Sequence, residues 1–410
     1  MKSLTETLIA MERHRSIFEN EIRTLPVPVC RAFGDQAKPM PPSFVSSGQV
    51  LSTRYSNSVG ASFPHTTSES GNAVLRSSSS LAAMPKGKRV AALFSGGPAS
   101  GGHNVLCGLK TILGSENTLL GVRGGPKGLL SGKLFVINDD DAAGIVNTGG
   151  FDFLGTDRTK IKTDEQYRQV KQVCTDNQID AIVIIGGDDS NTNAALLAEY
   201  LHSDVRANDA GVPVGVQVIG VPKTIDGDLQ VEGLLPISFG FDTATKIYAE
   251  MVGNILQDTP SSRKYWHFVK LMGRSASHVT LEVALQTKPA VALISEELAQ
   301  RKLSLSAVID MIANTVIARG RKGIYHGVVL IPEGLLEFIP QVKSLIDELN
   351  DKLVQLGNEL AQANAKDKCR IICEKLTVEN AQLLTSLPDY IQDMLLADRD
   401  SHGNLPVSLI

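Results

Sequence analysis

The sequence predicts an α/β protein of two Rossmann-like, doubly wound domains, with a helical insertion and an irregular N-terminal extension. From residue 89 onward, short apolar runs alternate with polar or glycine-rich turns and helical stretches, as in parallel sheets covered by helices. The apolar runs are also continuous, which is typical of parallel strands buried on both faces. A chain of 410 residues is too long for one ordinary core, so two domains are expected.

The composition is that of a soluble globular protein, with 42% hydrophobic and 20% charged residues. A net charge of −4 gives no electrostatic reason to expect nucleic acid or an anionic membrane as partner. No apolar run approaches the roughly 18–20 residues of a membrane span, and the N-terminus lacks the apolar core of a secretory signal. Five sparse cysteines suit a reducing, cytoplasmic compartment.

The first 85 residues form the extension, which is rich in Ser, Pro, Thr and Gly after a possible helix near residues 3–22. It reads either as a flexible tail or as an arm lying over the main domain or a partner subunit.

The repeating unit of the remaining chain is a strand, a polar turn and a helix. Helices are expected at 103–112 and 194–201. Because ligands bind outside the carboxyl ends of such strands, four polar turns are predicted to converge on one crevice. The predicted strands are residues 89–94, 179–185, 212–220, 265–272, 290–294 and 324–331.

A leucine-rich pattern follows Pro340, with apolar residues spaced by three and four. It predicts a helical hairpin that packs on itself or on the sheet, and a partner-binding stripe is the alternative. Cys369 and Cys373 fall in this region, and a zinc site would need further ligands at the right spacing, so they read as helix positions. The apolar residues are Val342, Ile346, Leu349, Leu353, Leu356, Leu360, Leu384, Leu387, Ile391 and Leu395.

Two glycine-rich turns follow predicted strands. "SGGPASGGHN" (95–104) opens a helix whose free N–H groups favour a phosphate, although a tight strand-to-helix turn is the plainer interpretation. "GGDDSN" (186–191) places Asp188 and Asp189 behind two glycines. One of these carboxylates can hold Mg²⁺, or cap the following helix.

Three further turns carry charge. "PKTIDGDL" (222–229) sets Asp226 and Asp228 on one side of an extended segment, where one can take a proton from a hydroxyl and the other support metal or water. Lys223 supplies a positive charge for a phosphoryl group, although a salt-bridged turn is the alternative. "MGRSASH" brings Arg274 to a helix start, and "PEG" brings Glu333 to a strand end.

Taken in order, these segments resemble the phosphofructokinase family over about residues 88–335. The likeness is closest to its pyrophosphate-dependent branch, in the long form. ATP-dependent members carry glycine at the position of Asp189 and commonly a small residue at that of Lys223. A carboxylate at Asp189 would repel the α-phosphate of a nucleotide, whereas compact pyrophosphate still fits. The matching segments are "FSGGPASGGHNV", "GGFDFLGTDRTKI", "IIGGDDSNTNAA", "PKTIDGDL", "KYWHFVKLMGRSASH" and "PEG".

The resemblance implies reversible phosphoryl transfer from pyrophosphate to the 1-hydroxyl of fructose 6-phosphate. It implies that Asp226 is the general base, with Asp228 also catalytic, and that Asp188 is the Mg²⁺ ligand. It implies that Asp189 and Lys223 set the donor and steady the transition state.

The resemblance also assigns the binding residues. Gly96 and Gly97 would cradle pyrophosphate. Lys264 and Tyr265 would reach the substrate of a neighbouring subunit, which implies a homodimer or a higher homo-oligomer. The remaining contacts to fructose 6-phosphate would come from Thr224, Asp226, Met272, Gly273, Arg274 and Glu333.

The implied division is an extension (1–85), a pyrophosphate and Mg²⁺ domain (86–262), part of a sugar-phosphate domain (263–337), the helical insertion (338–400) and the start of a further segment (401–410). Long-form members continue beyond this point with a "YEGR"-type motif that the sequence lacks, so a truncated chain is expected. The alternatives are an ATP-dependent phosphofructokinase, a related diacylglycerol- or NAD-kinase-like enzyme, or an inactive regulatory subunit. A regulatory subunit would be expected to lose its catalytic acids, and Asp188, Asp226 and Asp228 are all present.

Overall fold

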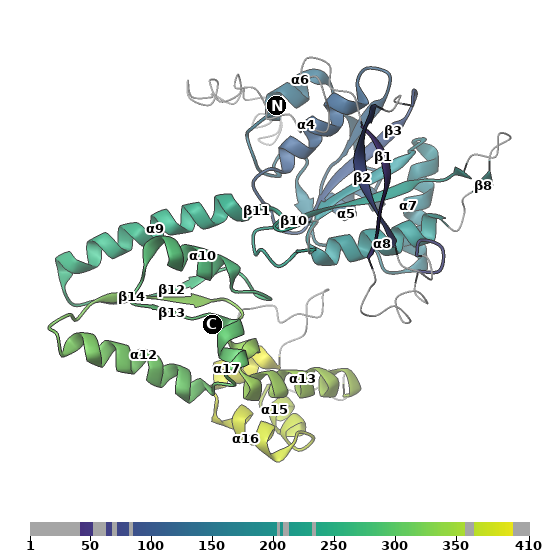
Figure 1. Cartoon of the computed structure of the whole chain (residues 1–410). Coiled ribbons are helices and arrows are strands. Elements are labelled where there is room, and N and C mark those ends of the chain that lie inside the picture. Colours follow the sequence, from purple (N-terminus) through teal and green to yellow (C-terminus); the bar gives the residue numbers. More distant parts are fainter. Residues whose placement is uncertain are drawn as a thin grey trace, which may run out of the picture. The chain divides into compact units, whose positions relative to one another are not determined.

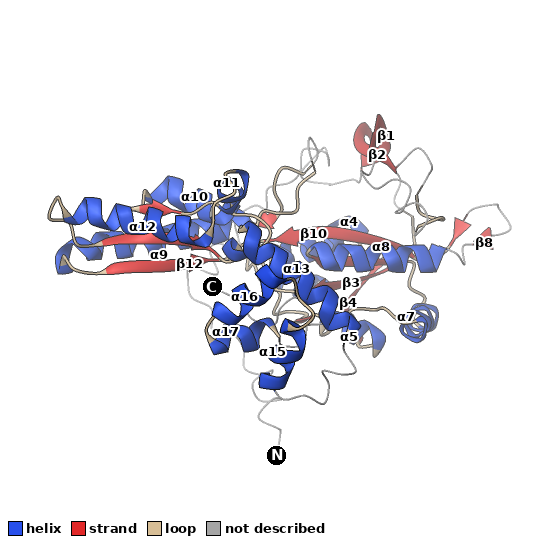
Figure 2. Ribbon diagram, turned by 90° about the horizontal axis from the view of Figure 1, so that it is seen from below, coloured by secondary structure: helices blue, strands red, loops and turns tan. Residues whose placement is uncertain are grey.

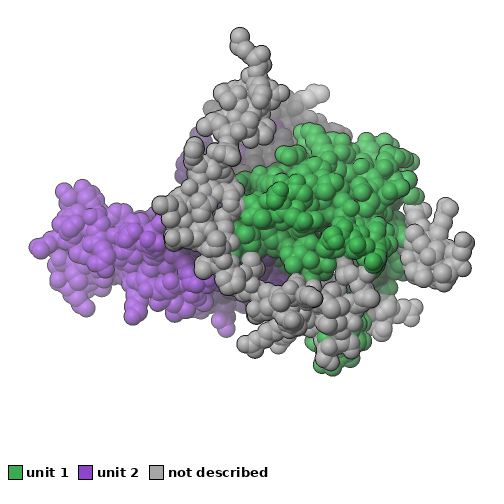
Figure 3. All heavy atoms as spheres, turned by 90° about the horizontal axis from the view of Figure 1, so that it is seen from above, with its two compact units in different colours: residues 1–222 green, residues 223–410 purple. Residues whose placement is uncertain are grey.

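The chain forms two compact units, residues 1–222 and residues 223–410, which Figure 3 colours separately. The structure is a computed structural model, and the residues it describes are 42–51, 63–67, 72–81, 85–202, 206–207, 213–231, 235–356 and 365–396. The expected helix near residues 3–22, Leu360 and the expected final segment 401–410 lie outside the described residues. The compact units divide after Pro222 and not after residue 262. The expected domain boundary after residue 262 describes a functional division, and it stays a prediction.

The first unit is built on a largely parallel sheet with the strand order β10-β7-β3-β4-β5, and β6 pairs with β3 (Figure 1). Only the pairing of β4 with β5 is antiparallel. The predicted strands 89–94 and 179–185 are confirmed, and both are buried apolar runs. The strands are β3 (Arg89–Ser95), β4 (Thr118–Val122), β5 (Leu134–Val136), β6 (Thr156–Asp157), β7 (Ala181–Gly186) and β10 (Gln217–Thr224).

Helices cover both faces of this sheet. Alternate strand residues point to opposite faces. Ala91 and Leu93 pack with apolar side chains of α5, α7 and α8 in one core cluster, whereas Phe94 lies on the other face, near His103 of α4. This is the doubly wound arrangement expected from the sequence. The helices are α4 (Gly102–Leu113), α5 (Gly125–Leu130), α6 (Asp139–Ile145), α7 (Asp164–Asp176) and α8 (Asp188–His202).

Strand β10 corrects one prediction. The apolar run 212–220 was expected to form one buried strand, but only β9 (Pro213–Val214) and the first part of β10 fall in it. Parallel pairing with β7 runs from Gln217 to Pro222, and β10 continues to Thr224, so Lys223 is a strand residue. Ile219 is 50% exposed. The apolar run therefore signalled the strand but neither its register nor its exposure.

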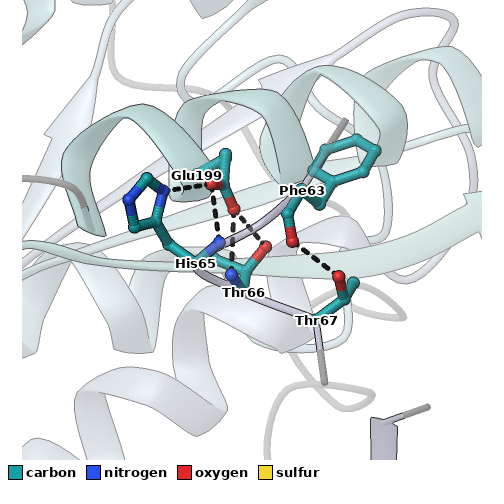
Figure 4. Close-up of polar contacts among 5 residues, drawn as sticks. All are labelled: Phe63, His65, Thr66, Thr67 and Glu199. Atoms are coloured by element: carbon teal, nitrogen blue, oxygen red, sulfur yellow. Dashed lines mark hydrogen bonds and ion pairs between the residues drawn. The ribbon is translucent and has the colours of Figure 1, made fainter. Parts of the chain in front are cut away.

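Residues 63–67 of the N-terminal extension lie on α8, which agrees with the alternative of an arm over the main domain, whereas its two strands were not predicted. β1 (Pro42–Leu51) and β2 (Asn72–Leu81) form an antiparallel pair, and β8 (Arg206–Ala207) pairs with β9. Figure 4 shows residues 63–67 held on α8 by Glu199. Its carboxylate accepts hydrogen bonds from the backbone N–H groups of His65 and Thr66, both at 2.9 Å, and from the Thr66 hydroxyl at 2.8 Å. The His65 ring also contacts Glu199.

The second unit contains the parallel sheet β12-β14-β13, seen with its helices in Figure 2. Apolar residues of α9 and α10 pack with β12 and β14 in one cluster, and those of α11 and α12 pack with β13 and β14 in another. The predicted strands 265–272, 290–294 and 324–331 are thus present. The elements are β11 (Phe239–Gly240), α9 (Phe241–Ser262), β12 (Trp266–Leu271), α10 (His278–Thr287), β13 (Val291–Ala292), α11 (Ser295–Gln300), α12 (Leu305–Gly320), β14 (Gly327–Pro332) and η2 (Leu335–Phe338).

The described residues of the leucine-rich region form more helices than the two of the expected hairpin, with an apolar cluster of their own centred on Leu345, Leu349 and Leu384. The expected helical insertion therefore packs on itself. Cys369 and Cys373 lie on α15 with their sulfurs 4.0 Å apart, and burial raises the pKa of the Cys373 thiol to about 11. The helices are α13 (Pro340–Gln355), α15 (Ala365–Cys373), α16 (Val378–Ser386) and α17 (Asp389–Leu395).

No described helix combines the length and apolar character that crossing a bilayer requires. Within the described ranges, no three His, Cys, Asp or Glu side chains come together in a way that could hold a metal ion.

Candidate active site

Three turns of the first unit meet at the carboxyl edge of its sheet. The ladders put Ser95 opposite both Asp157 and Gly186, so the ends of β3, β6 and β7 lie side by side. The Gly96 N–H donates to the Asp157 carbonyl at 3.0 Å, and the Thr156 hydroxyl donates to the Gly96 carbonyl at 2.7 Å. The predicted "SGG" and "GGDD" turns are therefore neighbours, and the turn that follows β6 joins them.

Asp188 and Asp189 begin α8 and have different partners. Asp188 is exposed, and its Oδ1 accepts the N–H of Asp189 at 2.7 Å, which is partly the capping role considered as an alternative. Asp189 pairs with Lys160, with 2.9 Å between Nζ and Oδ1. Asp189 is therefore positioned for something other than helix capping, because Lys160, from a different turn, forms an ion pair with its carboxylate.

Sequence reasoning quoted "GTDRTKI" but gave no role to Arg158 or Lys160. The Arg158 guanidinium lies beside Gly97, 3.7 Å from where a Cβ would stand on that residue. Asp157 fastens this turn: partial burial raises its pKa, but hydrogen bonds from Thr159, Lys127 and Arg158 outweigh it and hold the pKa below its ordinary value. The available signal was two cations in a short turn that follows a strand.

In the second unit, the "PKTIDGDL" segment is partly buried. Lys223 is only 6% exposed, which excludes an ordinary solvated turn. Ser238 holds Thr224 at both backbone groups, since its hydroxyl donates to the Thr224 carbonyl at 2.8 Å and accepts the Thr224 N–H at 3.2 Å. The Asp226 N–H donates to the Thr224 hydroxyl at 3.1 Å.

The expectation that Asp226 and Asp228 share one side of an extended segment is wrong. Gly227 between them has φ +74°, in the left-handed region, so the chain turns there. A Cβ on Gly227 would also stand 2.9 Å from the Phe241 ring. The strand ends at Thr224, and the two carboxylates belong to a tight turn that only glycine fits.

The Arg274 and Glu333 turns are packed against each other. The Gly334 N–H donates to the Gly273 carbonyl at 3.2 Å, and the Glu333 N–H donates to the Leu271 carbonyl at 2.8 Å. Gly334 is required here, because a Cβ would stand 1.8 Å from the Arg274 carbonyl oxygen. These contacts fix Gly273, Arg274 and Glu333 together at the carboxyl ends of β12 and β14.

Electrostatics link the two parts of this second cluster. Burial and the nearby carboxylates of Asp228 and Glu333 raise the pKa of Asp226 to about 6, although Lys223 and Arg274 oppose the shift. Burial and the charges of Asp226 and Glu333 also raise the pKa of Tyr248, a residue that the sequence did not single out. The structure thus brings together Lys223, Asp226, Asp228, Arg274 and Glu333.

Lys264 and Tyr265 are not part of this cluster. They precede β12, whereas Arg274 follows it, and a strand of this length separates its ends by roughly 20 Å. Tyr265 is 53% exposed, and the Lys264 ammonium lies over its ring, 5.3 Å from the centroid. Met272 lies on the Arg274 side and is exposed.

The fold and these polar clusters at strand ends define an α/β protein suited to anionic ligands. The family model described as Phosphofructokinase matches residues 89–384, and the chain belongs to the phosphofructokinase family. The predicted resemblance is confirmed. Phosphofructokinase from Pichia pastoris, in a T-state crystal structure, has a similar fold, with a TM-score of 0.52 and 21% identity over 65% of this chain and 29% of that chain.

Curated relatives are more similar in sequence. Proteins named pyrophosphate–fructose 6-phosphate 1-phosphotransferase from Treponema pallidum and Porphyromonas gingivalis are each 48% identical, over 80% and 78% of this chain. The beta 2 subunit of that name from Arabidopsis thaliana is 40% identical over 92% of this chain and 65% of its own length. The chain spans 56% and 57% of the two bacterial relatives.

Proposed function

We propose that the chain carries the catalytic residues of a pyrophosphate-dependent phosphofructokinase. The reaction is reversible transfer of a phosphoryl group from pyrophosphate to the 1-hydroxyl of fructose 6-phosphate, giving fructose 1,6-bisphosphate and phosphate. The names of the relatives at 48% identity support the substrates. The observation that carries the chemistry is the half-buried Asp226, with its raised pKa, among Lys223, Arg274 and Glu333.

Asp226 is the proposed general base. An ordinary aspartate is a weak base, and a pKa of about 6 brings it closer to neutral pH while leaving it mostly ionised there. The Asp226 carboxylate takes the proton of the sugar's 1-hydroxyl. At the same time, the oxygen of that hydroxyl bonds to the near phosphorus of pyrophosphate. The bond from that phosphorus to the bridging oxygen breaks, and phosphate leaves. Asp228 keeps Asp226 basic by repelling its negative charge.

Lys223 and Arg274 are the proposed anion contacts of the second unit. Lys223 is buried, and a buried ammonium interacts more strongly with a phosphoryl group than a solvated one does. Arg274 suits the planar, bidentate recognition of a sugar phosphate, and Glu333 suits its hydroxyl groups. Thr224, Met272 and Gly273 are proposed to complete the sugar-phosphate site. These roles position the substrate and neutralise charge, which is most of what phosphoryl transfer requires.

The cluster of the first unit is the proposed donor site. Gly96 and Gly97 let pyrophosphate approach the backbone closely, and the Arg158 guanidinium beside Gly97 offers N–H donors. Asp189, held by Lys160, excludes the larger nucleotide. Mg²⁺ is the proposed cofactor. It takes one or two protein carboxylates and completes its shell with phosphate and water oxygens, so the exposed Asp188 fits. Bound there, Mg²⁺ would neutralise charge on the phosphates.

A homo-oligomer and a cytoplasmic location are also proposed. Lys264 and Tyr265 are exposed and separated from the Asp226 cluster by β12, which supports a role in a neighbouring subunit's site. Plant relatives are named as subunits. Sparse cysteines support a reducing compartment.

The reverse reaction tests the proposal. The chain is incubated with fructose 1,6-bisphosphate, Mg²⁺ and phosphate, and the products are followed by ³¹P NMR. The expected result is formation of pyrophosphate and fructose 6-phosphate, with a loss of both when Asp226→Asn is used. Absence of pyrophosphate from wild-type reactions would reject the proposed donor.

A further inference from the structure

His278 contacts the turn that carries Asp226 and Asp228. It is the first residue of α10, and its Nδ1 lies 2.7 Å from the carbonyl oxygen of Gly227. A carbonyl oxygen only accepts, so Nδ1 carries the proton and donates in this contact. The two residues are 51 positions apart in the sequence, so the bond joins separate parts of the second unit.

The other hydrogen bonds described for this turn come from residues within 14 positions along the chain. Ser238 holds Thr224, the Thr224 hydroxyl holds the Asp226 N–H, and the Gln230 amide donates to the Gly227 carbonyl at 3.1 Å. Among these contacts, only that of His278 reaches the turn from a distant element. Gly227 also has the left-handed φ that turns the chain between Asp226 and Asp228. A hydrogen bond to its carbonyl therefore helps to fix the directions of both carboxylates.

The start of α10 is a firm support for His278. The Ser277 N–H donates to Glu296 at 2.8 Å, and the Ser277 hydroxyl accepts the Ser295 N–H at 2.9 Å. Both Ser277 and Ser295 are nearly fully buried. Arg274 precedes this support by three residues, on the turn that packs against Gly334. His278 therefore connects the Arg274 turn to the Asp226 turn through one hydrogen bond.

We propose that His278 is a positioning residue that fixes the Asp226–Gly227–Asp228 turn relative to Arg274, so that the base faces the hydroxyl of a bound sugar phosphate. The catalytic part rests on the proposed function, and the positioning part does not. Small misplacements of a catalytic group can cost large factors in rate, which is why one neutral hydrogen bond can matter here.

Two nearly isosteric variants test the proposal. In His278→Asn the amide nitrogen falls close to the place of Nδ1 and can still donate to Gly227, whereas in His278→Gln it falls close to Nε2 and cannot. The full chain is compared by hydrogen–deuterium exchange, which needs no turnover. The expected result is exchange at residues 224–230 that is roughly tenfold faster in the Gln variant and near wild type in the Asn variant, with β12 and β14 unchanged in both.

Kinetics form the second arm. With pyrophosphate, Mg²⁺ and fructose 6-phosphate, kcat is expected to fall roughly 10- to 100-fold in His278→Gln and less than about threefold in His278→Asn, with the KM for pyrophosphate unchanged in both. Equal effects of Asn and Gln on exchange, or faster exchange across the whole second unit, would overturn the positioning role. Wild-type protein without pyrophosphate-dependent turnover would reject the proposed function and leave the exchange result to stand by itself.

Discussion

The two polar clusters of the molecule handle charge in opposite ways. In the first unit, Asp188 is exposed, and the Asp189 side chain is 42% exposed and paired with Lys160. In the second unit, Lys223 is 6% exposed and Asp226 has its pKa raised by burial and by like charges. Solvated, paired charges cost the folded protein little free energy, whereas desolvated charges lower its stability. Desolvated ionisable groups with shifted pKa values are typical of catalytic sites. The difference supports the proposed division of roles, with ligand selection at the first cluster and proton transfer at the second.

The largest effect is expected at the buried carboxylate. Asp226→Asn keeps the shape of the side chain and removes the base, so kcat with pyrophosphate should fall by about 10²- to 10⁴-fold. Binding of pyrophosphate, measured by titration calorimetry, should stay within about threefold, because its site is assigned to the other cluster. A variant that keeps more than a tenth of wild-type turnover would break the division of roles.

The next largest effect is expected for donor choice. Asp189→Gly combined with Lys223→Gly removes the carboxylate that repels a nucleotide, so the ratio of kcat/KM for ATP over pyrophosphate should rise at least about tenfold. Lys160→Met is the matched control: it removes the Lys160 ion pair and keeps the Asp189 carboxylate, so activity with ATP should not appear. An unchanged ratio in the double variant would remove Asp189 and Lys223 from donor selection.

The free energy of unfolding tests the same comparison without an activity measurement. Burial raises the folded-state pKa of Asp226 from 3.8 to about 6, so the ionised carboxylate costs stability above pH 6, and the cost vanishes below about pH 4. Asp226→Asn should therefore be more stable than wild type by about 1–3 kcal/mol at pH 8 and equal to it at pH 4. Urea unfolding at both pH values measures this. Equal stability at pH 8 would mean that Asp226 is not strained.

The smallest effect is expected at Glu199, which belongs to neither polar cluster and holds residues 63–67 on α8. Burial tends to raise the pKa of Glu199, but hydrogen bonds from Thr66 and His65 outweigh this effect and hold the pKa below its ordinary value. This stabilisation is present above the ordinary carboxyl pKa and is lost as pH falls through the lowered one. Glu199→Gln should release residues 63–67 at a cost of about 1 kcal/mol, seen as faster proteolysis of this segment at pH 7, with kcat unchanged. Unchanged cleavage would contradict the clamp.

The sequence predicted the strands and glycine-rich turns well, because buried parallel strands are continuous apolar runs and the turns that follow them need glycine. Register was harder. Strand β10 pairs with β7 up to Pro222 and with β11 at Lys223 and Thr224, and no property of residues 212–220 reveals these partners. The turn at Gly227 was likewise missed, and the closeness of Phe241 and Ile237, which leaves no room for a Cβ there, is a tertiary contact that the motif does not reveal.

Single charges in the motifs were found, but their partners were not. Asp189 was identified from its neighbouring glycines, whereas Lys160 lies 29 residues earlier in a turn that had no assigned role. His278 was within a quoted motif, and its bond to Gly227 appears only when α10 and β10 are placed in space. Pair contacts across long sequence separations are what folding adds to the motif.

The most direct test of the account is the choice of phosphoryl donor by the wild-type chain. Formation of fructose 1,6-bisphosphate is measured with fructose 6-phosphate, Mg²⁺ and either pyrophosphate or ATP at equal concentration. The account predicts turnover with pyrophosphate that is at least about 100-fold faster than with ATP. Turnover with ATP and none with pyrophosphate would contradict it.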